Sequence, residues 1–204
     1  GANGGLIYLA ADDPSMHSSQ NEQDSRFYAD FAFIPCLEPS NQQEAYDMVH
    51  YGYELSERFH LPVMMRVTTR MAHSRAGVQT KEPKPENKTN CLPDARQRFI
   101  LLPALARKRY KALIAAQEVF ENESENSRFN QYFDAPNKKM GIITTGIAFN
   151  YLSENYPDGF EYPVLKITQY PVPVNKIQKL FDECDEILVL EEGYPVLEAQ
   201  LKGI

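Results

Sequence analysis

Long hydrophobic runs are absent from this sequence, and cysteine is scarce. The uninterrupted apolar runs cover only a few residues, far short of the roughly 20 that cross a bilayer, so no membrane contact is expected. The three cysteines, Cys36, Cys91 and Cys184, are odd in number and far apart. This spacing argues against a disulfide framework, a zinc knuckle and the tight cysteine run of an iron–sulfur cluster. It favours three reduced thiols.

Positive charge is also in short supply. The 204 residues carry 21 Lys and Arg against 28 Asp and Glu, a formal net charge of −7. The most basic stretches, 81–88 and 107–111, are short and mixed with acidic or apolar residues. Because a nucleic-acid binder needs clustered Lys and Arg to hold phosphates, we expect no nucleic-acid partner. No basic-then-apolar leader opens the sequence, so a cytoplasmic location is expected.

Apolar residues are plentiful enough to build a core. They make up 43% of the chain, which is too much for a disordered protein. The segment 4–11 is nearly all apolar and is bounded by Gly and Pro, which predicts a strand buried on both faces. The polar stretch 15–25 predicts a loop at the end of that strand, where binding residues often lie in open α/β sheets. A second short apolar run follows at 31–37.

A β–α–β unit is predicted next. Ser40 with Gln43 three residues later is a capping-box pattern that begins a helix. An apolar face then recurs at helical spacing over about four turns; its residues are Ala45, Met48, Val49, Gly52, Leu55 and Phe59. The run 63–68 predicts a buried strand. A unit of this size favours a parallel sheet.

The middle of the chain changes character. The stretch 80–90 has two prolines and many charges, which predicts a linker or an exposed excursion. The segment 105–120 is predicted to be helical, and 121–128 is predicted to be a loop. The expected inner face of the helix consists of Leu105, Ala106, Tyr110, Leu113, Ile114 and Phe120.

A second block of alternating strands and helices begins at Lys139. Strands are predicted at 140–144, 164–168 and 186–190, and a helix begins in the segment 147–152. Ile177, Leu180, Phe181 and Cys184 mark a further amphipathic helix. A closing helix is expected to have Pro195 at its first position and Leu197 and Leu201 inside. This half is therefore also predicted to be a parallel α/β layer.

The segment 12–26, DDPSMHSSQNEQDSR, is the outstanding polar cluster. Its amides and hydroxyls suit recognition of a carboxylate or carbonyl, whereas a charge clamp would need more cations than Arg26. Three interpretations stay open: a solvated loop without a ligand, a metal site made by Asp12, Asp13 and His17, and a substrate or cofactor loop. Composition favours the first. Adjacent residues of an extended chain point apart, which disfavours the second.

Two other strand ends carry weaker signals. Arg70, His73 and Arg75 follow the strand at 63–68, and they either attract an anion at the same sheet edge or pair with acids. The segment 144–146, Thr-Thr-Gly, lacks the spaced glycines and the lysine of a phosphate-binding loop, so a tight turn is predicted there.

The remaining ionisable candidates have simpler explanations. Glu191 and Glu192 could form an acid pair, but we expect them to interact with the dipole of the helix near Pro195. His50 and His60 lie on or at the end of a predicted helix, and surface positions are expected for both. No nucleophile motif of the G-x-S-x-G type occurs.

Several of these segments together resemble one enzyme family. The string from Asn3 through Arg26 is similar to the large, thiamine-diphosphate-binding (alpha) subunit of indolepyruvate:ferredoxin oxidoreductases, within the 2-oxoacid:ferredoxin oxidoreductase superfamily. Further matches are LEPS at 37–40 with QEA at 43–45, RVTTR at 66–70 with HSR at 73–75, GIITTGIA at 141–148 and VLEE at 189–192. The resemblance covers nearly the whole chain and is vaguest at 76–100.

The resemblance implies an enzyme that decarboxylates an aryl pyruvate on thiamine diphosphate, attaches the acyl group to coenzyme A and passes electrons through 4Fe-4S clusters to ferredoxin. It implies an α/β fold of parallel sheets with flanking helices. The later part of a pyrimidine-binding domain is expected at 1–75, a linker with a helix at 76–138, and a transketolase C-terminal-like domain at 139–204. The implied partners are the smaller (beta) subunit, ferredoxin and coenzyme A, in a homo- or hetero-oligomer.

Parts of the family pattern have no counterpart in this sequence. They are the glutamate that activates the cofactor, the domain that holds the diphosphate and its divalent metal, and the cysteine-rich cluster segment. We therefore expect a fragment of a longer subunit that is inactive alone and binds no cofactor or metal by itself. The few strands of the first half, too few for a covered parallel sheet, support this expectation.

Within this interpretation, five loop residues are expected to line the edge of the substrate and thiazolium pocket: His17, Ser18, Ser19, Gln20 and Asn21. No motif match assigns a catalytic role to any of them. An alternative is that the chain is an assembly or dimerisation module without chemistry of its own. A third possibility keeps the mechanism and changes the substrate to pyruvate or a branched 2-oxoacid.

Overall fold

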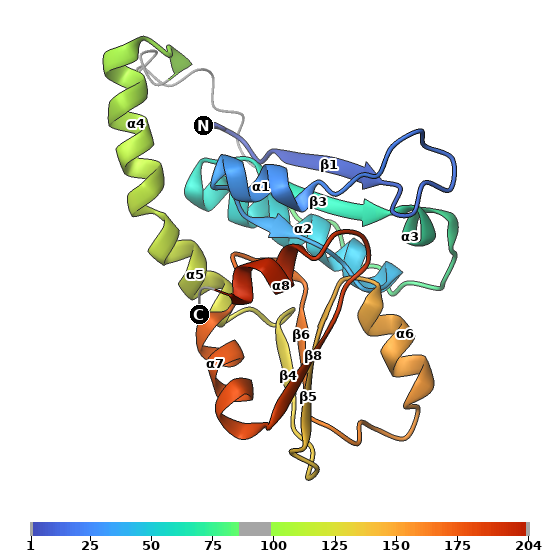
Figure 1. Ribbon diagram of the computed structural model, residues 1–204. Coiled ribbons are helices and arrows are strands. Elements are labelled where there is room, and N and C mark those ends of the chain that lie inside the picture. Colours follow the sequence, from blue (N-terminus) through green and yellow to red (C-terminus); the bar gives the residue numbers. More distant parts are fainter. Residues whose placement is uncertain (1, 86–98, 203–204) are drawn as a thin grey trace.

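Two four-stranded sheets and their flanking helices make up the structure, a computed structural model that describes residues 2–85 and 99–202 (Figure 1). The first sheet has the strand order β1-β3-β2-β7. Its strands are β1 (Ile7–Asp12), β2 (Cys36–Leu37), β3 (Val63–Thr68) and β7 (Gln169–Tyr170). β3 is parallel to β1 and β2, whereas β7 is antiparallel to β2.

The second sheet has the order β4-β6-β5-β8. Its strands are β4 (Gln131–Phe133), β5 (Met140–Thr145), β6 (Val164–Ile167) and β8 (Glu186–Leu190). β5 is parallel to β6 and β8, whereas β4 is antiparallel to β6. The predicted α/β class is therefore confirmed, and each sheet also carries an antiparallel edge strand.

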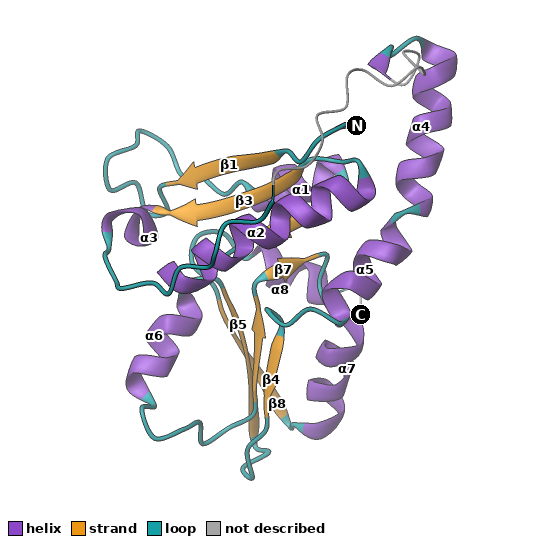
Figure 2. Ribbon diagram, turned by 180° about the vertical axis from the view of Figure 1, so that it is seen from behind, coloured by secondary structure: helices purple, strands orange, loops and turns teal. Residues whose placement is uncertain are grey.

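Three helices follow the strands of the first sheet: α1 (Arg26–Ala32), α2 (Gln42–Phe59) and α3 (Thr69–His73). α4 (Pro103–Ala115) and α5 (Gln117–Glu125) come next, and α6 (Ala148–Asn155), α7 (Val174–Glu183) and α8 (Val196–Leu201) belong to the second half. Figure 2 shows α2 lying along the first sheet and α6 and α7 on either side of the second.

A shared core joins the two sheets. Successive residues of β3 point to opposite faces, so Met65 packs with α2 whereas Met64 points toward the second sheet. On that side Met64, Ala10 and Cys36 belong to one cluster with Ile143 of β5 and residues of β6, α7 and α8. The buried Lys166 of β6 also forms an ion pair with Glu44 of α2. The carboxyl ends of the two sheets are thereby held against each other.

The prediction for the first strand is wrong in one respect. β1 forms, but it is an edge strand, and Tyr8 and Leu9 are 58% and 60% exposed. Because neighbouring residues point to opposite faces, exposure of both means that neither face of β1 is fully covered. Apolar composition predicted the strand correctly and its burial incorrectly.

The segment after the first loop also differs from the prediction. Helix α1 was not foreseen, and of the apolar run 31–37 only Cys36–Leu37 pairs as a strand. The predicted capping box is shifted by one residue, since the Asn41 side chain accepts from Glu44 N and the Glu44 carboxylate accepts from Ser40. The strand at 63–68 and the apolar face of α2 are confirmed.

The middle segment requires a larger correction. The predicted helix at 105–120 is two helices, α4 and α5, and the predicted loop at 121–128 begins only after Glu125. Of the expected inner face, Phe120 is buried, whereas α4 contains no buried residue. Residues 80–85 have no helix or strand, as expected for a linker; the rest of the predicted linker, 86–90, and Cys91 lie outside the described residues.

The second block agrees more closely. β5, β8, α6 and α7 form where they were predicted, with Ile177 and Leu180 fully buried. Pro195 precedes α8 instead of occupying its first position, and Leu197 is buried as expected. β4 and β7 were not foreseen because each is only two or three residues long. Among the helices described, none is long and apolar enough to span a bilayer.

Candidate functional site

The carboxyl ends of the two sheets meet at a cluster of buried charges. Arg66 lies in β3 and is fully buried. Its Nε donates to Asp12 Oδ2 at the end of β1, 2.6 Å away, and its Nη1 donates to the Glu38 carboxylate just after β2. Three neighbouring strand ends of the first sheet are thus tied to one guanidinium.

Arg26 extends this cluster to the second sheet. Its Nε and Nη2 donate to the two carboxylate oxygens of Asp24, at 2.9 and 2.5 Å. Its Nη1 donates to Glu191 Oε2 at 2.9 Å, and its Nη2 also donates to the carbonyl of Tyr194. Because Glu191 follows β8, this one side chain connects the long loop to the far sheet.

The cluster as a whole is anionic. Two guanidiniums face the four carboxylates of Asp12, Asp24, Glu38 and Glu191, so its formal charge is negative. The hydroxyl of Tyr170 donates to Glu38 Oε2 at 2.9 Å, and burial together with the Glu38 charge raises the Tyr170 pKa. Such a cluster suits structural fixation better than binding of a free anion.

Asp12 remains ionised within this buried setting. Burial alone would raise its pKa, but hydrogen bonds from the hydroxyl and backbone N–H of Ser25 and the guanidinium of Arg66 outweigh burial and lower it. The two ends of the loop 12–26 are closed by these bonds, since Ser25 sits at its far end. The first and last residues of the loop therefore lie next to each other.

Asp13 organises the inside of the same loop. One of its oxygens accepts the backbone N–H groups of Ser18 and Ser19 at 2.7 and 2.8 Å, and the other accepts the Thr69 hydroxyl at 2.6 Å. These bonds from Thr69, Ser18 and Ser19 hold the Asp13 pKa well below its usual range. Asp13 is therefore an anchor for the loop backbone, with three of the roughly four acceptor positions of its carboxylate occupied.

Two glycines allow the close approach of the second sheet. Gly146, with φ +47°, lies so near Glu38 that a Cβ would stand 2.7 Å from its Cγ. Gly193, with φ +104°, leaves only 2.9 Å between a Cβ and Asp24 Oδ2. Both positions require positive φ and lack of a side chain, which other residues do not provide. The predicted tight turn at 144–146 serves this packing.

A groove of about 660 Å³ opens beside the cluster. Its wall is formed by β1, the second half of the loop, α1 and Tyr194. Phe27 and Tyr194 make an edge-to-face contact, with ring centroids 6.0 Å apart. The groove combines aromatic surface with amides and carboxylates, which suits an organic ligand with a polar end.

The structure separates the five predicted site residues. Asn21 lines the groove, whereas His17, Ser18, Ser19 and Gln20 lie on the tip of the loop outside it. Four of the five side chains are exposed and that of Ser19 is half-buried. Asp13 accepts the backbone N–H groups of Ser18 and Ser19, while the side chains of the other residues are accessible.

The weaker candidates have mostly structural roles. Arg70 Nε pairs with Glu192 Oε1 at 3.0 Å, so the acid-pairing interpretation holds for Arg70, while His73 and Arg75 are exposed. The Glu191 carboxylate accepts the backbone N–H groups of Leu197 and Glu198, as expected from the helix dipole.

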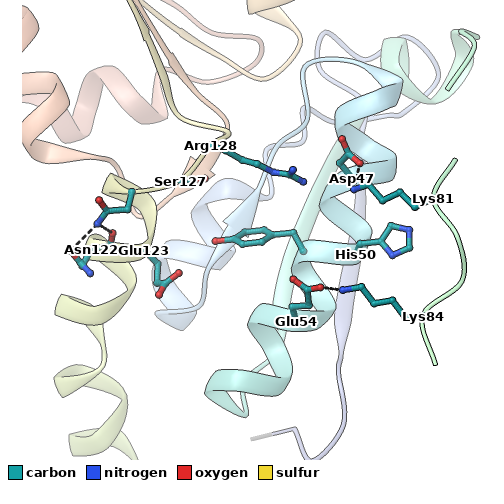
Figure 3. Close-up of a pocket in the computed structure, with 11 residues that line it drawn as sticks. Asp47, His50, Glu54, Lys81, Lys84, Asn122, Glu123, Ser127 and Arg128 are labelled. Atoms are coloured by element: carbon teal, nitrogen blue, oxygen red, sulfur yellow. Dashed lines mark hydrogen bonds and ion pairs between the residues drawn. The ribbon is translucent and has the colours of Figure 1, made fainter. Parts of the chain in front are cut away.

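A second hollow, of about 520 Å³, lies between α2, α5 and the segment at Lys81 (Figure 3). His50 lines it and is half-buried, so the expectation that it lies on the surface holds only in part. Lys81 Nζ pairs with Asp47 Oδ1 at 2.5 Å, and Lys84 pairs with Glu54. Charges that neutralise one another in this way leave little to recognise a ligand.

The chain is similar over nearly its whole length to subunits of known enzymes. The chain is 41% identical over 212 aligned residues to indolepyruvate oxidoreductase subunit IorA of Pyrococcus abyssi, and 40% identical over 210 to that of Thermococcus kodakarensis. For IorA of Methanothermobacter thermautotrophicus the identity is 35% over 207 residues. The matches cover 99–100% of this chain and 32–34% of the relatives. The chain is related to these subunits over about a third of their length. The family resemblance predicted from the sequence is confirmed.

The fold is also similar to one of known structure. A 2-oxoglutarate:ferredoxin oxidoreductase from Magnetococcus marinus, solved with 2-oxoglutarate, coenzyme A and succinyl-CoA bound, superimposes with a TM-score of 0.64. It is 14% identical, and the match covers 95% of this chain and 42% of that one. No family model matches the chain.

Sequence reasoning missed the centre of this IorA-like segment. Arg66 was predicted only to lie in a buried strand, and both Arg66 and Glu38 were otherwise named only within stretches that resemble the family, with no role assigned. A signal was present: an arginine inside the apolar string VMMRVT needs carboxylate partners when the strand is buried. Which carboxylates supply them depends on the packing of the two sheets.

Proposed function

We propose that the chain is a segment of the large subunit of a thiamine-dependent 2-oxoacid:ferredoxin oxidoreductase that acts on indolepyruvate. The whole enzyme would decarboxylate the 2-oxoacid oxidatively, join the acyl group to coenzyme A and pass the electrons through iron–sulfur clusters to ferredoxin, in the cytoplasm and with a smaller partner subunit. The observation that carries this proposal is the 35–41% identity to IorA subunits over 99–100% of the chain.

This segment would contribute the wall of the site and not the cofactor's anchor. Among the residues that the structure describes, no group of three His, Cys, Asp or Glu is arranged to hold a metal ion. The polar side chains nearest the groove include the carboxylates of Asp12 and Asp24, which repel a diphosphate. Because the donor set does not fit the diphosphate and its metal, we assign no cofactor ligand and no catalytic step to these residues.

The loop tip is our candidate for contact with substrate. His17, Ser18, Ser19, Gln20 and Asn21 combine an imidazole, hydroxyls and amides, which can hydrogen-bond the carboxylate or carbonyl of a 2-oxoacid. Their support is the anchored backbone beneath them, since Asp13 fixes the amides of Ser18 and Ser19. An anchored loop loses less conformational entropy on binding than a free one.

The experiment that tests the function uses the complete subunit assembled with its partner. Reduction of ferredoxin is measured with indolepyruvate, pyruvate and a branched-chain 2-oxoacid, each with and without thiamine diphosphate and coenzyme A. The expected result is the highest kcat/KM for indolepyruvate and dependence on both additions. A preference for one of the other acids would change the substrate, and no activity on any would overturn the proposal.

An assembly role without chemistry is the second candidate, because the buried polar groups at the sheet junction are occupied by one another. Calorimetric titration of the 204-residue chain with thiamine diphosphate and Mg²⁺ tests it. Absence of binding supports a scaffold role for the isolated chain. Stoichiometric binding would contradict that role and would place a cofactor ligand in this segment.

A further inference from the structure

Helices α4 and α5 form a rod at the side of the molecule. Only Ala116 separates them, and the N–H of Phe120 donates to the Ala116 carbonyl at 3.1 Å, so the two helices follow each other closely. α5 packs on the body through the buried Phe120, whereas α4 extends away from both sheets in both views (Figures 1 and 2).

α4 has little support within the chain. None of its 13 residues is buried. Leu101 and Leu102, which precede it, are 74% and 60% exposed. An isolated helix shorter than about 12–15 residues is marginal in water, so a helix of this length needs a surface to pack against. The described part of the chain provides such a surface in two places. The Tyr110 ring meets Phe33, and Arg109, Ala112 and Leu113 line a hollow together with residues 59–61.

The charge of the rod changes sign along its length. α4 carries two arginines and two lysines and no acid, and α5 carries four glutamates and no base. Two of the glutamates are engaged within the body, since Glu123 pairs with Arg58 and Glu125 accepts from the first turn of α7. Glu118 and Glu121 are exposed.

One exposed face of the rod carries both signs in order. Two rows of residues at steps of three lie along it, and all are exposed: Lys108, Lys111 and Ile114, then Ala115, Glu118 and Glu121. From one end to the other the face therefore reads basic, apolar, acidic. The partly buried residues, among them Leu105 and Leu113, lie toward the other side.

We propose that this face pairs with the same face of a second copy of this chain, with the two rods antiparallel. A two-fold axis between residues 114 and 115 places Lys111 opposite Glu118 and Lys108 opposite Glu121. Ile114 of each copy then meets Ala115 of the other. Each of these two lysines and two glutamates gains an opposite charge, and the exposed Arg107 on the same side comes opposite Asn122.

The pattern itself selects a second copy as the occupant. An isologous interface must be complementary to itself when reversed, and a basic-apolar-acidic face has this property. A parallel pair would place like charges side by side. In the antiparallel register Leu101 and Leu102 also lie beside the second copy's chain just beyond its α5. This pairing accounts for the exposed apolar residues at the start of the rod.

Charge reversal tests the proposal with the full chain. Sedimentation at concentrations up to about 200 µM should show a mass rising from one chain of 23.3 kDa toward two. The acidic variant, Lys108→Glu with Lys111→Glu, and the basic variant, Glu118→Lys with Glu121→Lys, should each dissociate at least about tenfold more readily. Lys139→Glu with Lys202→Glu is the matched control and should associate like the original chain.

Mixing distinguishes the proposed pairing from a general loss of folding. The acidic and the basic variant should form heterodimers when combined, and the variant with all four reversals should recover self-association. Added salt should weaken all of these species because the pairs are exposed. A monomeric original chain across this range would overturn the proposal. So would failure of the mixed variants to associate, or binding of the rod only to the smaller subunit of the enzyme. Since self-association is measured without substrate, its failure leaves the proposed activity unaffected.

Discussion

The ends of the loop 12–26 and its tip lie close together but differ in almost every physical property. At the ends, Asp12, Asp24 and Arg26 are buried and every one is held by a charged partner. At the tip, His17 and Gln20 are exposed. The backbone is constrained in both places, through Asp12 and Ser25 at the ends and through Asp13 under the tip.

The comparison indicates that the loop ends stabilise the fold, whereas the tip is available to bind a ligand. A buried charge that loses its partner is costly, so changes at the loop ends should act on folding. An exposed polar side chain contributes little to folding, so changes at the tip should act only on binding. Variants ordered by their expected effect on the free energy of unfolding can test this separation.

The largest effect is expected from Arg66→Met. It removes the guanidinium that binds both Asp12 and Glu38 and leaves Glu38 only the more distant Arg26, 4.0 Å away, which should lower the free energy of unfolding by about 3–5 kcal/mol in urea denaturation. Arg58→Met removes an arginine that is half exposed and pairs with Glu123, and it should cost no more than about 1 kcal/mol. Equal losses for the two variants would refute the special role of the buried cluster.

A smaller loss is expected from Gly193→Ala. The new Cβ would stand 2.9 Å from Asp24 Oδ2 on a backbone with φ +104°, so strain and overpacking together should cost about 1–3 kcal/mol. Gly159→Ala is the control, because φ is +111° there and nothing lies within 4 Å of the new Cβ. If contact with Asp24 matters, Gly193→Ala should be the more harmful of the two.

Low pH should reduce the stability that the loop ends contribute to the fold. Because the pKa of Asp12 is lower in the folded chain than its ordinary value of 3.8, its ionisation stabilises the fold above that value. That contribution should be lost as the pH falls through the folded pKa. Urea denaturation across this range should show a shallower pH dependence for Asp12→Asn than for the original chain; identical slopes would contradict the assignment.

The smallest effect on folding is expected at the tip. His17→Ala and Gln20→Ala should change the free energy of unfolding by less than about 0.5 kcal/mol. In the complete assembled enzyme, both should reduce thiamine-dependent turnover of indolepyruvate sharply, whereas Gln178→Ala on α7 should not. Unchanged kinetics for both tip variants would remove the loop from the site.

Elements with strong local patterns could be predicted from the sequence. Helix α7 shows its apolar stripe at Ile177 and Leu180, and β8 is an apolar run with charged ends. Elements that depend on packing could not. The strand β7 consists of Gln169 and Tyr170 and exists because β2 lies beside it. Helix α4 was predicted to bury an apolar face, yet it has no buried residue.

The candidate site divides in the same way. The polar string after the first strand marked the loop, because its amides and hydroxyls are local and visible in the sequence. The pairing of Arg66 with Glu38, or of Arg26 with Glu191, was not visible, because the partners are far apart along the chain. Long-range ion pairs have no periodicity for a sequence pattern to reveal.

The sequence by itself determined the α/β class, the family relationship and the segments that form most strands and helices, because side-chain periodicity and backbone preference are local properties. Tertiary structure alone decided that β1 is an exposed edge, that the charges at the carboxyl ends of the two sheets converge, and that α4 stands apart. Those features depend on which surfaces pack together. Whether a charge is buried with a partner, or an apolar face is left exposed, is decided by residues that are distant in the sequence.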